Sequence, residues 1–225
     1  MNPYFTFNNI SSEDFLTVDK LPSIIRATKN IQKIEIEGRD GFLTQDNGSY
    51  KGILKTVECW IKDLKDIDFI CEWLSGSSEV IFSNEPEKIY KTTIINQIEF
   101  IKFMKEFHKF IILFECQPHK YSLNNTMITL KSAGAIYNNG SNSKPIIKIY
   151  GSGTINLIIN DNIITIDNIS EYVVINSDLM DCYKDTLLKN NDMSGEFPEL
   201  LPGINNISWT GALTKIEITP NWRWL

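Results

Sequence analysis

The sequence has few of the residue types that catalysis and metal binding use most, and it has no long apolar run. It contains two histidines and four cysteines in 225 residues. Its longest purely apolar run, residues 110–114, is far shorter than the roughly 18 residues that a membrane span needs. The N-terminal segment lacks the basic region and apolar stretch of a secretory signal. We therefore expect a protein that is made in a cytoplasm and does not insert into a membrane.

Basic residues are too few and too scattered for a nucleic-acid-binding surface. The chain has 22 Lys and Arg against 28 Asp and Glu, which gives a net charge of -6. A protein that binds nucleic acid usually presents a basic stripe, so we expect no sequence-specific binding to DNA or RNA. The hydrophobic content of 42% is typical of a folded globular chain. The length suits two domains of roughly 100 residues each.

The histidines and cysteines do not complete a recognisable site. Cys116 and His119 have the C-x-x-H spacing of a zinc half-site, but no second pair completes the four ligands that structural zinc requires. His108 lies among phenylalanines, and a packed or surface imidazole explains it better than a general base. The four cysteines have no regular spacing, and we expect four buried thiols in a reducing compartment.

The acidic residues and the glycine-rich segment are explained by ordinary structure. Glu35 and Glu37 share one strand face, and a solvated face accounts for them better than a pair of glycosidase carboxylates. The aspartates at 178, 181 and 185 lack the spaced loop of a calcium site. Residues 151–153 read as a turn, because a strand pattern follows them and no helix N-terminus is available for a phosphate. No catalytic, cofactor-binding or metal-binding residue is therefore assigned, and we expect no enzyme.

The first half of the chain is rich in strand patterns. Residues 33–38 alternate isoleucine with glutamate, which predicts a half-buried strand, and the Asp40-Gly41 and Asn47-Gly48 pairs predict tight turns. Residues 50–61 predict a second strand. Residues 66–76 have apolar side chains at helical spacing, an Asp at the start and a Gly at the end, which predicts one short helix.

The segment from Lys88 to Pro118 fits either a helix or strands. Its spacing matches a helix, but its Ile and Phe content favours two or three strands with a turn at residues 105–108. Gln117-Pro118 is expected to interrupt any regular element. Turn residues become more frequent after residues 118–122, and this change marks a candidate domain boundary.

The second half predicts about six short strands separated by turn residues. Five of the strands are expected at residues 146–150, 154–160, 162–166, 172–177 and 212–220. The turn residues between them include residues 138–140, 151–153 and 161–162. This pattern is typical of a β-sandwich or jelly roll. Residues 193–211, MSGEFPELLPGINNISWTG, combine turn residues with large apolar ones. We expect an ordered crossover in which Phe197, Leu200 and Leu201 are buried and Pro202-Gly203 forms a type II-like turn.

Nine stretches follow one another along almost the whole chain in an order that resembles a known family. They are FTFNNISSEDF, IEIEGRDG, EWLSG, EPEKIYK, FECQPHKY, NNGSNSKPIIKIYGSG, YVVINSDLMDCY, GEFPELLPGINNISWTG and ITPNWRWL. Together they resemble the distal tail protein (Dit) family, the tail hub proteins of long-tailed bacteriophages. The sequence departs from the family's pattern at Asn176, where an aspartate is expected, and at His119, where an aromatic residue is usual.

The resemblance implies a mainly β chain with two domains. Residues 1–120 would be a β-rich α+β domain with one short helix that forms a six-membered ring around the tail channel. Residues 121–225 would be a galectin-like β-sandwich on the outside of the ring. The implied protein is a homo-hexameric hub of the virion that joins the tail-tube protein to a tail-associated tip, fibre or lysin protein. It would be assembled in the bacterial host cytoplasm, and its negative charge would suit a channel through which DNA slides.

Two further expectations concern saccharide binding. Only about 105 residues follow the predicted boundary, which leaves room for the sandwich but not for the carbohydrate-binding insertion of some longer relatives. The alternative function is a carbohydrate-binding module, with Trp209, Trp222 or Trp224 as stacking platforms. We expect Trp222 and Trp224 to pack on the protein instead.

Overall fold

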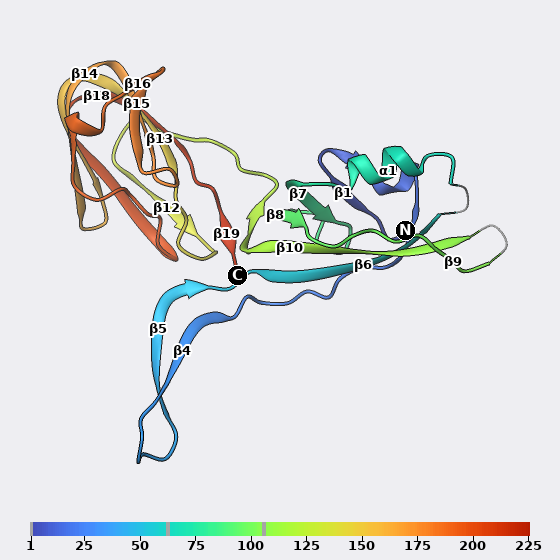
Figure 1. Ribbon diagram of the computed structural model, residues 1–225. Helices are drawn as coiled ribbons and strands as arrows, with labels where there is room; N and C mark the ends of the chain where they lie inside the picture. Colours follow the sequence, from blue (N-terminus) through green and yellow to red (C-terminus); the bar gives the residue numbers. More distant parts are fainter. Residues whose placement is uncertain (1, 62–63, 105–106) are drawn as a thin grey trace. The chain divides into compact units, whose positions relative to one another are not determined.

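The computed structural model describes residues 2–61, 64–104 and 107–225. Strands account for most of the chain (Figure 1), so the mainly β fold class predicted from the sequence is confirmed. The chain divides into two compact units by residue contacts: unit 1 is Met1–Leu123 with Leu225, and unit 2 is Asn124–Trp224. The functional domains 1–120 and 121–225 remain our proposal. None of the helices in the described part has the length and apolar character needed to cross a membrane.

Unit 1 is built on an antiparallel sheet with the strand order β2-β1-β7-β8-β10-β6-β3, with β9 paired to β10, while β4 and β5 form a separate two-stranded sheet. Its elements are β1 (Phe5–Phe7), β2 (Ile10–Ser11), the 3-10 helix η1 (Ser12–Asp14), β3 (Thr17–Lys20), β4 (Lys29–Glu35), β5 (Phe42–Tyr50), β6 (Ile53–Ile61), α1 (Ile67–Trp73), β7 (Ser77–Phe82), β8 (Lys88–Ile94), β9 (Ile101–Lys102) and β10 (His108–Ser122).

The helix of unit 1 forms where the sequence predicts it. Of the four apolar residues at helical spacing, Ile70, Trp73 and Leu74 are buried, whereas Phe69 is 44% exposed and contacts the Phe15 ring at 4.7 Å. The Trp73 indole stacks on the Phe5 ring at 5.7 Å and donates a hydrogen bond of 2.8 Å to the Phe7 carbonyl. These contacts join the helix to β1. Asp66 occupies the N-cap position, but its side chain makes no capping hydrogen bond.

Residues 88–118 form strands, as expected, and the predicted turn at 105–108 lies partly outside the described residues. The expectation that Gln117-Pro118 would end the element is wrong, because β10 continues to Ser122. The pairing of β10 with β8 instead shifts register between Cys116 and Lys120. A proline has no N–H for the ladder, and a bulge is one of the few places in a sheet that tolerates it.

Unit 2 is an antiparallel sheet with the order β11-β18-β13-β14-β15-β16, in which β12 also pairs with β18 and β17 with β14. Its elements are β11 (Ile128–Leu130), β12 (Gly134–Asn138), β13 (Ile146–Ile159), β14 (Asn162–Asn176), β15 (Asp181–Lys184), β16 (Leu187–Leu188), the 3-10 helix η2 (Asn190–Asp192), β17 (Met193–Ser194), β18 (Gly203–Thr219) and β19 (Arg223–Trp224).

The three central strands of unit 2 are longer than the sequence predicts. The expected strands at 146–150 and 154–160 are one strand, β13, and those at 162–166 and 172–177 lie in β14. The residues expected to separate them make bulges at which the strands bend (Figure 1), so that one sheet curls around an isoleucine-rich core. Gly151 permits the bend because a Cβ there would lie 2.4 Å from the Ala212 carbonyl oxygen.

The cysteines are all free thiols, but they are not all buried as expected. Cys59, Cys116 and Cys182 are buried, whereas Cys71 is exposed on α1. Burial raises the pKa of the Cys59 and Cys116 thiols, and it raises the pKa of Cys182 to about 11. The buried thiols are therefore poor nucleophiles near neutral pH.

This difference predicts selective labelling of Cys71. In the native protein at pH 8, a disulfide reagent that releases a chromophore should react rapidly with one thiol per chain. In denaturant it should react with all four cysteines. The Cys71→Ser variant is the control and should lose the rapid phase. A second rapid thiol in that variant would contradict the assigned burial.

Candidate assembly surfaces

The hairpin of β4 and β5 carries several exposed apolar residues of unit 1. The sequence predicts a half-buried strand at 33–38, but only residues 33–35 lie in β4, and the predicted burial is wrong. Ile34 and Ile36 are 38% and 43% exposed, and Phe42 and Leu43 on β5 are 51% and 41% exposed. No third strand pairs with the hairpin among the described residues, and most residues of both strands are exposed. Glu35 lies within the hairpin and Glu37 in the turn that follows β4, and both are exposed.

Turn residues shape the hairpin differently from the prediction. The chain reverses between Ile36 and Gly41, where Arg39 N donates to the Ile36 carbonyl over 3.1 Å. The Asn47-Gly48 pair is not a second turn, because it lies inside β5. The register shifts there, and the Asp46 carboxylate accepts a 2.9 Å hydrogen bond from Gly48 N. The pair therefore makes an irregularity near the base of the hairpin.

A second apolar surface lies at the start of β10. We define the aromatic patch as Trp60, Phe103, Met104 and Phe107, which line an open hollow of about 300 Å³. Phe103 and Met104 are 57% and 55% exposed. The Phe107 and Trp60 rings meet edge to face at 5.0 Å. The sequence analysis missed this patch, because alternation along a strand does not show whether a surface is covered.

A charged cluster lies inside unit 1 near the base of the hairpin. Lys55 is only 1% exposed, and its Nζ lies 4.0 Å from Glu85 and 4.5 Å from the centre of the Tyr90 ring. It donates a 3.2 Å hydrogen bond to the Ser23 carbonyl, in the segment that leads to β4. Glu85 also accepts hydrogen bonds from Lys120 and from the Tyr90 hydroxyl. The sequence contained a signal for this cluster. Side chains alternate between the two faces of a strand, and Lys55 lies on the same face of β6 as its buried residues.

The charges in this cluster shift one another's pKa values. Burial lowers the pKa of Lys55, and the Glu85 carboxylate opposes that shift. Burial would raise the pKa of Glu85, but hydrogen bonds from Lys120 and Tyr90, with the charges of both lysines, hold that pKa below its ordinary value. One carboxylate thus stabilises two ammonium groups, and its loss would leave Lys55 without a counter-charge.

The apolar residues of the 193–211 stretch are only partly buried. Leu200 is fully buried and Phe197 packs on the core of unit 2, as expected. The expectation for Leu201 is wrong, since it is 45% exposed. Gly203 has the positive φ of +95° that a type II-like turn requires. The buried Asn205 holds this turn, accepting from Leu201 N and donating to the Leu201 carbonyl, each over 2.8 Å.

The residues considered for metal or acid–base chemistry do not form a common site. Cys116 is buried and its thiol lies 3.5 Å from the Thr92 hydroxyl, while the His119 ring contacts Tyr50 edge to face at 6.0 Å. His108 has a buried Nδ1 for which the described residues provide no hydrogen-bond partner. No group of three or more His, Cys, Asp or Glu among the described residues is placed to hold a metal ion.

The three aspartates considered for calcium point to different partners. Asp178 lies 3.9 Å from Lys144, and Asp181 accepts a 3.3 Å hydrogen bond from the Asn190 amide. Asp185 accepts a hydrogen bond from the hydroxyl of Tyr172. Each carboxylate therefore serves its own local contact.

The tryptophans proposed as saccharide platforms pack within unit 2. Trp209 and Trp222 contact its core. The indole of Trp224 lies against Gly140, where an added Cβ would be 3.2 Å from the ring. On another face of the unit, Tyr150 and Tyr172 form a ring pair, and Lys148 Nζ lies 4.0 Å from the centre of the Tyr172 ring. These contacts do not favour saccharide stacking at the named tryptophans.

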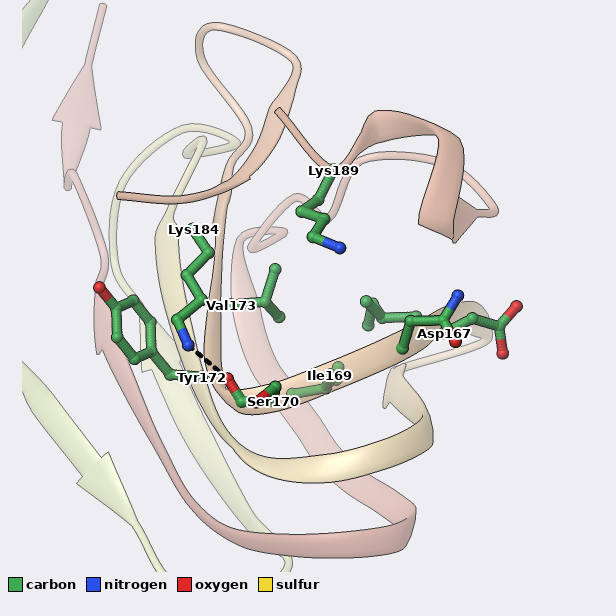
Figure 2. Close-up of a pocket in the computed structure, with 9 residues that line it drawn as sticks. Asp167, Ile169, Ser170, Tyr172, Val173, Lys184 and Lys189 are labelled. Carbon is green, nitrogen blue, oxygen red and sulfur yellow. Dashed lines mark hydrogen bonds between the residues drawn. The ribbon is translucent and has the colours of Figure 1, made fainter. Parts of the chain in front are cut away.

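A small cavity of about 60 Å³ lies beside the bend of β14 and is drawn in Figure 2. Lys184 points into it and donates a 2.7 Å hydrogen bond to the Ser170 carbonyl (Figure 2). Lys189 pairs with Asp192 at 2.8 Å, and Asp167 accepts a 2.7 Å hydrogen bond from Thr154. The polar groups are thus occupied by local contacts, and the cavity is too small for a substrate.

Comparison with known proteins bears on the fold. No family model matches the sequence, and no curated protein matches it. A solved structure of the SPP1 Dit protein (gp 19.1), described as a paradigm of the hub adsorption apparatus in phages that infect Gram-positive bacteria, is similar over 100% of both chains. The TM-score is 0.77 and the sequence identity is 14%. The two chains therefore share their fold over both units.

Proposed function

We propose that this protein is a structural hub of a bacteriophage tail, a distal tail protein without catalytic activity. The observation that carries the proposal is the fold similarity to a phage hub protein, which extends over the whole of both chains and not over one common domain alone. A shared sandwich by itself would carry little weight, because such folds serve many functions.

The proposed assembly is a homo-hexameric ring. A ring needs two different complementary surfaces on each subunit, because a heterologous contact repeats around the axis. Unit 1 offers two separate exposed apolar surfaces, the hairpin and the aromatic patch. In this proposal, residues 1–120 form the ring and residues 121–225 form an outer β-sandwich of galectin-like type.

The proposed partners lie on the two sides of the ring. One side binds the tail-tube protein, and the other binds the tip, fibre or lysin protein that contacts the host. DNA passes through the channel without sequence-specific binding. The protein is placed in the virion at the tail tip and is assembled in the cytoplasm of the host.

The mass of the purified protein tests the ring. Light scattering during gel filtration at two concentrations should give a species of about six times the 25.8 kDa subunit. Negative-stain images of that species should show a central hole. A strict monomer at high concentration would contradict a ring that closes without its tail partners, and screening against glycans would then test the saccharide-binding alternative.

A further inference from the structure

The two faces of the hairpin differ in charge. Residues opposite one another in an antiparallel pair share a face, so Ile34 and Leu43 lie on one face together with Gln32 and Gln45. This first face carries no charged side chain within the paired residues from 31 to 35 and from 42 to 46. The second face carries Lys33, Glu35 and Asp46, and the Nζ of Lys33 lies 4.5 Å from the centre of the Phe42 ring. The first face is therefore the one suited to a contact that excludes water.

The hairpin needs such a contact to be stable in water. An isolated two-stranded hairpin is marginally stable at best, and stability normally requires a third strand or packing against another element. The described residues of the same chain provide no third strand. Most of the residues of both strands are exposed. A hairpin left open in this way is suited to a contact from another copy of the chain.

The aromatic patch, like the first face of the hairpin, has no net charge. Its four residues are uncharged, and the hollow is also lined by Asp19 and Lys109, whose 3.2 Å ion pair leaves the lining without net charge. Lys109 Nζ also lies 4.7 Å from the centre of the Phe103 ring, and Phe103 remains 57% exposed. In a chain with a net charge of -6, two surfaces without net charge can meet without the repulsion expected between acidic ones.

The two surfaces lie at opposite ends of one strand pair in unit 1. The hairpin joins β6 at Ile53, which pairs with Cys116, whereas Trp60 in the patch pairs with Lys109 near the start of β10. Figure 1 shows the hairpin and the start of β10 at opposite ends of β6. Seven residue steps of 3.3 Å separate Ile53 from Trp60, or about 23 Å. Both surfaces are exposed in the same chain, so they do not cover each other. They are arranged for contact between successive copies.

We infer that the uncharged face of the β4–β5 hairpin of one copy docks on the aromatic patch of the next copy. This inference rests on the proposed ring and specifies its contact. The contact is heterologous, because hairpin and patch are different surfaces, and it repeats from subunit to subunit until the ring closes. Lys55 and Glu85 support it indirectly, since Lys55 binds the Ser23 carbonyl in the segment that leads to the hairpin.

Mixing two defective variants tests the inference. The hairpin variant is Ile34→Glu with Leu43→Glu, and the patch variant is Phe103→Glu with Met104→Glu. Each should be a monomer, because each lacks one half of the contact. The patch variant still donates an intact hairpin, and the hairpin variant still offers an intact patch. An equimolar mixture should therefore form a 1:1 dimer, about twice the subunit mass of 25.8 kDa, and nothing larger.

Two controls match the charge of these variants. Phe42→Glu with Thr44→Glu alters the opposite face of the same hairpin, and Met180→Glu with Leu188→Glu alters exposed apolar residues of unit 2. Both should assemble like the unchanged protein. Circular dichroism and thermal unfolding establish that every variant is folded.

The outcomes separate this contact from the ring itself. If the unchanged protein forms a ring and either defective variant also does, the assigned contact is wrong while the ring stands. If both folded variants are monomers and their mixture stays monomeric, the hairpin does not meet the patch. If the unchanged protein is a monomer at every concentration, the self-closing ring and the contact are both overturned.

Discussion

Replacing Gly211 by alanine is expected to destabilise unit 2 severely. Gly211 has a φ of +102°, a region that side chains of L-residues rarely adopt, and an added Cβ would lie 2.5 Å from the Thr154 carbonyl oxygen. Backbone strain costs about 1–3 kcal/mol, and forcing atoms into a packed site costs about another 1–3 kcal/mol. Calorimetry should show a much lower melting temperature, and the buried Cys182 thiol should react faster.

Gly153→Ala is the matched control for this prediction. Gly153 also has a positive φ, +75°, but an added Cβ would meet no atom within 4 Å. The backbone cost of a left-handed residue is about 1–2 kcal/mol, so this variant should unfold at a temperature much closer to that of the unchanged protein. Equal losses in the two variants would show that close packing at the strand bend contributes nothing.

Replacing Glu85 by glutamine is expected to destabilise unit 1. The change leaves Lys55 buried without a counter-charge, and breaking a buried ion pair in this way costs about 3–5 kcal/mol. Guanidinium unfolding should measure the loss. The double variant Glu85→Gln with Lys55→Met should recover a large part of it, because the unpaired charge is gone. Glu87→Gln, an exposed neighbour, is the control.

The pH dependence of stability provides a second readout of Glu85. Its pKa is lower in the folded state than in the unfolded chain, so the folded protein favours the ionised carboxylate. That contribution is fully present well above the unfolded-state pKa of about 4.3 and is lost as the pH falls through the lower, folded-state pKa. The stability of unit 1 should therefore fall less steeply below pH 4.5 in Glu85→Gln than in the unchanged protein. Parallel curves would contradict the assigned role.

Local patterns predicted most of the secondary structure. Helical spacing of Ile70, Trp73 and Leu74 located α1, because one stripe of a helix must be buried wherever the helix packs. The Ile and Phe content of residues 88–118 correctly favoured strands. Residues 151–153 were wrongly predicted to be a turn between two strands, and they lie inside β13. A glycine that ends a strand and one that allows a strand to bend look alike in sequence.

The candidate surfaces were much less predictable. The alternation of apolar and charged residues identified the strand that contains Ile34 and predicted that one of its faces is buried. In the structure Ile34 is exposed. The same limit applies to Leu201 and Cys71, which are apolar or thiol side chains that remain exposed. In each case the residue type favours burial, but burial requires a second element that packs against it.

The sequence alone determined that the chain is mainly β, where its helix forms and which side chains alternate along each strand. These properties depend on residues that are neighbours in the chain. Only the tertiary structure decided that the β4–β5 hairpin stands uncovered, that Lys55 is enclosed with Glu85 and Tyr90, and that the long strands of unit 2 curl at Gly151 and Gly211. Those properties depend on contacts between residues far apart in the chain, and a local pattern records them only in part, as the place of Lys55 among the buried residues of β6 does.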